Sequence, residues 1–92
     1  MSNYGLFETK QFQKDLVRLS RSGEPSVAVK LDRVVYPQLR LHPHFGPHIR
    51  KLRGYDPPTW RYRIGAWRFF YEIDDDERTV FLIAAQHRGS AY

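Results

Sequence analysis

Three closely spaced arginines are the residues of this sequence whose chemistry is easiest to state. Arg61, Arg63 and Arg68 lie within residues 60–71, WRYRIGAWRFFY. A guanidinium group donates two parallel hydrogen bonds to a phosphate and stays charged at neutral pH. The three arginines, called the arginine row below, are therefore typical of a site that binds an anion such as a phosphate group.

The stretch that carries the arginine row has the pattern of a β-hairpin. Aromatic and β-branched residues alternate with arginine on both sides of Gly65-Ala66, and a Gly-X pair between such runs favours a two-residue type II′ turn. This turn places Arg63 opposite Arg68 on one face and leaves the other face entirely apolar. Like charges facing each other are destabilising, so we expect an anion between them. The alternative is an ordinary solvated face with Glu72 as a partner.

The charge of the chain points to the same kind of partner. The 92 residues carry a net charge of +5, and residues 50–68 hold six Lys or Arg against one acid. A basic stretch of this kind favours a polyanion, most simply nucleic acid. We expect Arg50, Lys51 and Arg53 to contact this nucleic acid, together with Phe70, which shares the arginine face and can stack on a base.

Composition excludes several classes of protein. The chain has no cysteine, so neither disulfides nor thiolate metal sites hold it together. It contains no run of about 20 apolar residues and no secretion signal, so we expect a cytoplasmic protein without membrane contact. Three of the four histidines lie in residues 42–48, HPHFGPH, where prolines favour an extended loop. We expect a solvated loop there, near a phosphate backbone, and neither a metal site nor a cofactor.

The remaining pattern predicts one domain over residues 1–92, of the α+β class. A weakly alternating strand over residues 4–8 precedes an amphipathic helix that begins at Lys10. A second helix follows Ser26, and Pro37 predicts a kink or an end near Tyr36. The strands that follow are expected at residues 49–53, in the hairpin, and at residues 79–85 after an acidic turn at 74–78. The register of the last strand stays open, since the turn has five or six residues.

This order resembles the RelE/ParE superfamily of toxins from toxin–antitoxin pairs. The resemblance rests on KLRG at 51–54, WRYRIGAWRFFYEID at 60–74 and HRGSAY at 87–92. It implies two N-terminal helices packed on one face of a small antiparallel sheet. Relatives of the RelE type are metal-independent endonucleases that cut messenger RNA in the ribosomal A site and are held inactive by a cognate antitoxin. ParE-type relatives share the fold but poison DNA gyrase.

Roles carried over from RelE-type relatives fall on six residues. The resemblance makes the arginine row the phosphate-binding and charge-stabilising group, and adds His87, Arg88 and Tyr92 from the end of the chain. Some relatives have lysines in place of Arg61 and Arg63, and the chain ends at Tyr92 without the further residues often seen.

The reaction that such residues support is attack of an RNA 2′-OH on the adjacent phosphate. An enzyme must align the hydroxyl, take its proton, stabilise the added charge and protonate the leaving oxygen. His87 has the better ordinary pKa for a base, about 6.5, whereas Tyr92 needs neighbouring cations to lower a pKa near 10. The leading hypothesis is thus a ribosome-dependent mRNA endonuclease with ribosomal RNA contacts and an antitoxin partner. The alternatives are a gyrase inhibitor and a non-catalytic binding module for nucleic acid or protein.

Overall fold

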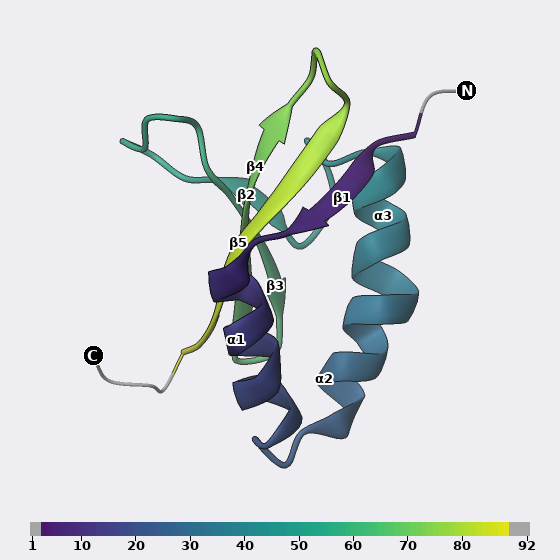
Figure 1. Cartoon of the computed structure of the whole chain (residues 1–92), viewed down its shortest axis with the longest axis vertical. Coiled ribbons are helices and arrows are strands. Elements are labelled where there is room, and N and C mark those ends of the chain that lie inside the picture. Colours follow the sequence, from purple (N-terminus) through teal and green to yellow (C-terminus); the bar gives the residue numbers. More distant parts are fainter. Residues whose placement is uncertain (1–2, 89–92) are drawn as a thin grey trace.

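The fold consists of a five-stranded sheet and a helical hairpin that covers one of its faces. A computed structural model describes residues 3–88, and Figure 1 shows its elements. Strand β1 (Gly5–Glu8) leads into α1 (Lys10–Ser20). The chain returns through α2 (Pro25–Lys30), the π-helical segment η1 (Leu31–Val35) and α3 (Tyr36–Leu41), and then forms β2 (Ile49–Lys51), β3 (Trp60–Ile64), β4 (Trp67–Asp74) and β5 (Thr79–His87).

The sheet order is β1-β5-β4-β3-β2, which corrects one feature of the prediction. The last four strands are antiparallel to their neighbours, but β1 pairs with β5 in parallel, so the sheet is mixed. The helices follow β1, as expected from the strand predicted over residues 4–8, so they are not the first elements of the chain. A short alternating strand has the same sequence pattern in either orientation, so the sequence carried no sign of the parallel pairing.

The second helix does not end near Tyr36, one of the two outcomes predicted for Pro37, but a π-helical segment interrupts its regular α-helical bonding directly before that residue. Residues 31–35 form a π turn in which the Tyr36 N–H donates to the Leu31 carbonyl, and α3 then runs to Leu41 with Pro37 in its first turn. The π turn directly before α3 interrupts the regular i→i−4 bonding, and such an interruption accommodates a residue that has no N–H to donate. Figure 1 shows that α2 leads into α3 along one continuous helical path.

The core lies between the helical hairpin and one face of the sheet. Phe12 of α1 and Leu39 of α3 are completely buried against Phe69, Tyr71 and Leu82 of the central strands. As predicted, the apolar face of the β3–β4 hairpin lies in this core, with Tyr62 and Phe69 buried and Ile64 partly buried. None of the helices in the described part of the chain is both long and apolar enough to cross a membrane.

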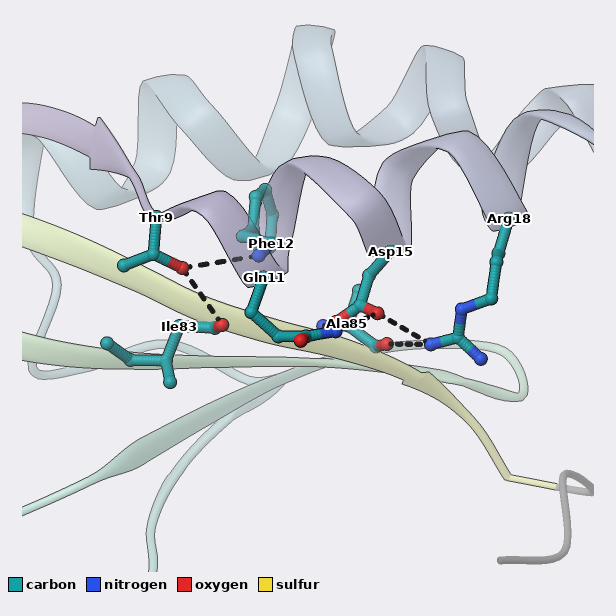
Figure 2. Close-up of polar contacts among 7 residues, drawn as sticks. All are labelled: Thr9, Gln11, Phe12, Asp15, Arg18, Ile83 and Ala85. Atoms are coloured by element: carbon teal, nitrogen blue, oxygen red, sulfur yellow. Dashed lines mark hydrogen bonds and ion pairs between the residues drawn. The ribbon is translucent and has the colours of Figure 1, made fainter.

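Beyond the end of β1, side chains of Thr9 and of α1 form hydrogen bonds with the backbone of β5 (Figure 2). Thr9 caps α1 by accepting from the Phe12 N–H, and its hydroxyl lies 3.1 Å from the Ile83 carbonyl oxygen. Asp15, buried, accepts from the Ala85 N–H at 2.8 Å, while Arg18 donates to the Ala85 carbonyl at 3.1 Å. These bonds satisfy the edge of β5 and hold the end of that strand in place.

Candidate functional site: an arginine face on the sheet

The turn between β3 and β4 sets which side chains share a face. Gly65 has φ +55°, the left-handed conformation that the first position of a type II′ turn requires. Arg63 consequently pairs with Arg68, as the sequence predicted. Arg61 pairs with Phe70 on one side and with Arg50 of β2 on the other. These pairs form a basic surface on the face of the sheet opposite the helices, with Phe70 at its inner end.

The guanidinium groups of this arginine face have no anionic partner within residues 3–88. The three ion pairs there involve other side chains, those of Asp15, His44 and His87 with their partners. The Nε atoms of Arg61 and Arg68 are buried and make no hydrogen bond, whereas that of Arg63 donates to the Gly65 carbonyl at 3.2 Å. Buried donors are normally satisfied, so two orphaned ones in a cationic cluster indicate a site for an anion.

Electrostatics support the same conclusion for Arg61. Burial lowers the pKa of its guanidinium below the ordinary value, and the nearby charges of Arg50, Arg63 and Arg68 lower it further. Burial and like charges both penalise the cationic form, and a bound phosphate relieves the second effect directly. An anion beside Arg61 would therefore offset the repulsion among these guanidinium groups.

The predicted catalytic residues at the end of β5 do not all lie on the arginine face. A bulge at Ile83 shifts the pairing, so that Phe70 faces Ala84 while Tyr71 faces Leu82. Gln86 then lies opposite Arg68 on the arginine face, and His87 lies opposite the buried Trp67 on the helix face. Gln86 was not a candidate, because it could be placed only once this register was known.

His87 is not brought together with the arginine row. Its ring meets Trp67 edge-on with centroids 5.4 Å apart, and its Nε2 lies 3.5 Å from the Glu24 carboxylate. The same carboxylate accepts a hydrogen bond from the Trp67 indole at 3.2 Å. These contacts tie the turn between α1 and α2 to the end of the sheet.

Arg88 lies beside the hairpin turn, and Tyr92 lies outside the described residues. The Arg88 N–H donates to the Ala66 carbonyl at 2.6 Å, which places this residue next to the β3–β4 turn with its side chain exposed. The chain therefore continues toward residues 89–92 from a point close to Arg63 and Arg68, which flank the same turn.

The other predicted RNA contacts divide between two faces of β2. Arg50 is exposed and faces Arg61, so it extends the arginine face. Lys51 faces Trp60 instead, with its amine 5.6 Å from the centre of the indole ring. Arg53 is exposed in the loop after β2, two residues beyond Lys51, the last residue of that strand.

The histidine-rich loop is more tightly packed than predicted. Pro43 is buried and accepts a hydrogen bond from the Tyr71 hydroxyl at 2.7 Å. His44 is half-buried between Tyr4 and Trp60, and its Nε2 lies 3.1 Å from Asp75. The backbone of this loop is therefore held by the core, and within residues 3–88 no cluster of three or more His, Asp or Glu is arranged to hold a metal ion.

Comparison with known proteins identifies the fold and the family. Residues 7–92 match the family model described as the ParE toxin of the type II toxin–antitoxin system parDE. A comparison with curated protein sequences finds no match. The solved toxin–antitoxin complex RelBE2 of Mycobacterium tuberculosis is similar at 25% identity and a TM-score of 0.73, covering 94% of this chain and 99% of that one.

Two further solved structures share the fold. A metal-bound toxin from Helicobacter pylori is 22% identical with a TM-score of 0.78, over 97% of this chain and 99% of that one. A mutant of the E. coli toxin RelE in complex with a peptide of antitoxin RelBc is 22% identical with a TM-score of 0.69, over 99% of this chain and 87% of that one.

Proposed function

The chain belongs to the ParE toxin family of type II toxin–antitoxin systems, within the RelE/ParE superfamily, and we propose that it acts as a ribosome-dependent mRNA endonuclease neutralised by a cognate antitoxin. The observation that carries the proposal is the arginine face. Several guanidinium groups meet there without an acidic partner among residues 3–88, and two of them have buried, unbonded Nε atoms. A phosphodiester supplies the charge and the acceptors that these groups lack.

The proposed reaction needs no metal or cofactor. The 2′-OH of the RNA attacks the neighbouring phosphorus, its proton passes to a base, and the 5′-oxygen leaves with a proton. Arg61 and Arg68 bind the non-bridging oxygens and stabilise the charge that grows on them, with Arg63 and Arg88 beside them. Arg50 and Phe70 hold the flanking strand by charge and by stacking on a base.

Tyr92 is the proposed base, in preference to His87. His87 faces the helices and contacts Glu24 and Trp67, on the opposite side of the sheet from the arginine row. Tyr92 follows Arg88 by four residues, and Arg88 lies at the β3–β4 turn between the two strands of the row. Cations beside a phenol lower its pKa, as a base at neutral pH requires.

A second candidate function is inhibition of DNA gyrase without RNA cleavage. It is favoured by the ParE description of the matching family and by the orientation of His87 away from the arginine face. In that case the arginine face contacts DNA or an acidic surface of the enzyme.

One experiment with two arms separates these functions. Purified protein is added to a reconstituted translation reaction, and the ends of the reporter message are mapped; in parallel, it is added to a gyrase supercoiling assay. We expect new message ends that form only when ribosomes are present, and unchanged supercoiling. Intact message together with blocked supercoiling would replace the proposal with the second candidate.

A further inference from the structure

A cleft of about 600 Å³ opens at the edge of the sheet next to the arginine face. Strand β2 begins at Ile49, which pairs with Tyr62, so the last residues of β3 extend beyond the end of β2. Only the His48 carbonyl continues the pairing, by accepting from the Arg63 N–H at 3.0 Å. Side chains from both faces of β3 therefore reach the cleft, which is bounded on its far side by the helical hairpin.

The lining of the cleft combines apolar walls with positive charge. Its residues come from α2 and η1, from the loop before β2, and from β3 and its turn: Lys30, Val34, Pro47, His48, Arg61, Tyr62, Arg63, Ile64 and Gly65. Val34, Pro47 and Ile64 provide apolar surface, and Val34 is 50% exposed although it points from a helix toward the sheet edge. Every residue of the lining that carries a fixed charge is a cation.

Arg61 and Arg63 belong to both the cleft and the arginine face. A phosphate held by them is consequently adjacent to the cleft, and the nucleoside attached to that phosphate is within reach of its apolar walls. The His48 and Tyr62 rings lie at the same place, with centroids 6.0 Å apart and planes inclined by 44°. Tyr62 is buried, so the exposed ring of His48 is the one of the two that offers a surface on which a nucleobase can stack.

We propose that this cleft is a nucleotide pocket, in which the base next to the arginine-bound phosphate inserts between Val34 and Ile64 and its phosphate contacts Lys30, Arg61 and Arg63. The proposal rests on the proposed function and adds a specificity to it. A protein that reads a base at this point cuts some sequences better than others. The volume suits one nucleotide, since pockets for ligands of that size measure roughly 300–1,000 Å³.

The test is a titration of the labelled full chain followed by NMR. The probes are adenosine, guanosine, cytidine and uridine 5′-monophosphates, with inorganic phosphate and ribose 5-phosphate as probes that lack a base. We expect ring-current shifts of the Val34 and Ile64 methyl signals with the nucleotides only, whereas all probes shift the Arg61 and Arg63 Nε signals. Methyl shifts of equal size with phosphate alone, or none with any nucleotide, would overturn the proposal and leave the cleft to a protein segment.

A matched pair of variants tests the position of the base. Val34→Trp fills the cleft, while Val29→Trp adds the same ring at another half-exposed helical valine outside the lining. We expect Val34→Trp to weaken nucleotide binding at least tenfold, about 1.4 kcal/mol, and Val29→Trp to leave it unchanged. Equal effects of the two variants contradict the assignment, and a circular dichroism melt of each verifies that it is folded.

The cleavage assay distinguishes failure of this inference from failure of the proposed function. If the protein does not cut RNA but nucleotides still bind at Val34 and Ile64, the endonuclease proposal fails and the pocket stands. If the wild type cuts RNA and Val34→Trp cuts the same positions at the same relative rates, the pocket fails and the endonuclease stands.

Discussion

Arg63 and Arg68 face each other directly across the β3–β4 ladder, and within residues 3–88 neither guanidinium group forms an ion pair. Like charges in directly opposed positions destabilise a sheet. The hairpin therefore carries a repulsion that a bound anion would remove, so binding of an anion by these two side chains would also stabilise the hairpin.

The first prediction concerns this repulsion. Arg68→Gln removes one of the two charges together with a buried, unbonded Nε, so the free energy of unfolding is expected to rise by about 0.2–1 kcal/mol at low ionic strength. Salt screens exposed charges, so the gain should shrink in about 0.5 M salt. Urea unfolding at both ionic strengths measures it. The control is Arg33→Gln on the exposed side of η1; a gain no larger than the control's would refute the prediction.

The second prediction is the salt dependence of RNA binding. Each phosphate that a protein neutralises on a single strand contributes about −0.7 to the slope of log affinity against log salt concentration. Arg61 is flanked by three arginines and has a buried, unbonded Nε, so Arg61→Gln should reduce the magnitude of the slope by about that amount. Fluorescence anisotropy with a short labelled RNA gives the slopes. If the slope of the wild type is near zero, the arginine face does not bind phosphates.

The third prediction tests the bonds between α1 and β5. Asp15→Ala leaves the Ala85 N–H without its acceptor in a buried position, which costs about 1–3 kcal/mol of stability. Hydrogen exchange at Ala85 should accelerate by a corresponding factor. The matched control is Asp32→Ala, which removes an exposed carboxylate from η1. Unchanged exchange at Ala85 in the Asp15 variant would show that the bond does not protect this strand.

The hairpin was predictable because its signals are local. Alternating residues and one Gly-X pair are enough to define the turn, and the turn determines that Arg63 faces Arg68 and that the apolar face lies beneath the helices. The strand order was less accessible, because the parallel pairing of β1 with β5 joins residues 74 positions apart, such as Gly5 and Thr79. No local pattern reports a contact of that range.

The candidate site was predictable only in part, for a related reason. A bulge at Ile83 shifts the pairing of β5 by one residue, and a shift of one residue exchanges the two faces of a strand. With that register unknown, either His87 or Gln86 could lie on the arginine face, and the family resemblance favoured His87. The structure places Gln86 there, and the ring of His87 against Trp67.

The fourth prediction is a pH dependence at the N-terminal edge of the sheet. The hydrogen bond from the Tyr4 hydroxyl, 2.6 Å from Asp75, lowers the pKa of that carboxyl below its ordinary value of 3.8, and the bond from His44 acts in the same direction. The same bond raises the pKa of Tyr4 above 10.0. A carboxyl group whose pKa is lowered by folding stabilises the fold at pH values above its pKa in the unfolded chain, and this stabilisation is lost as the pH falls through the folded pKa. A phenol whose pKa is raised by folding stabilises the fold below its pKa in the unfolded chain, and this stabilisation is lost as the pH rises through the folded pKa.

Tyr4→Phe should therefore be less stable than the wild type by a nearly constant amount between about pH 5 and pH 9. The difference should decrease below that range, as Asp75 is protonated, and above it, as Tyr4 ionises. Tyr55→Phe is the control, because that ring is 58% exposed and its hydroxyl makes no hydrogen bond within residues 3–88. A difference that stays the same at acidic pH would mean that the Asp75 bond adds nothing to stability.

The last prediction concerns catalysis at Arg68. Arg68 is the first arginine after the turn, faces Arg63 and lies beside Gln86, so a phosphate on this face would be contacted from both β3 and β4. If its guanidinium group meets charge that develops only in the transition state, Arg68→Ala lowers the cleavage rate by about 10²–10³. Binding should fall much less, since Arg50, Arg61 and Arg63 still contact the backbone.

Cleavage rates and binding affinities measured on the same ribosome-bound message test this role of Arg68. Arg33→Ala, on the exposed side of η1, is the matched control and should change neither quantity. Equal losses of rate and affinity in Arg68→Ala would identify Arg68 as a contact made alike in the ground state and the transition state, and the catalytic assignment would then be wrong. Unchanged rate and affinity would mean that the arginine face is a solvated surface, because a preorganised donor cannot be removed from a working site without cost.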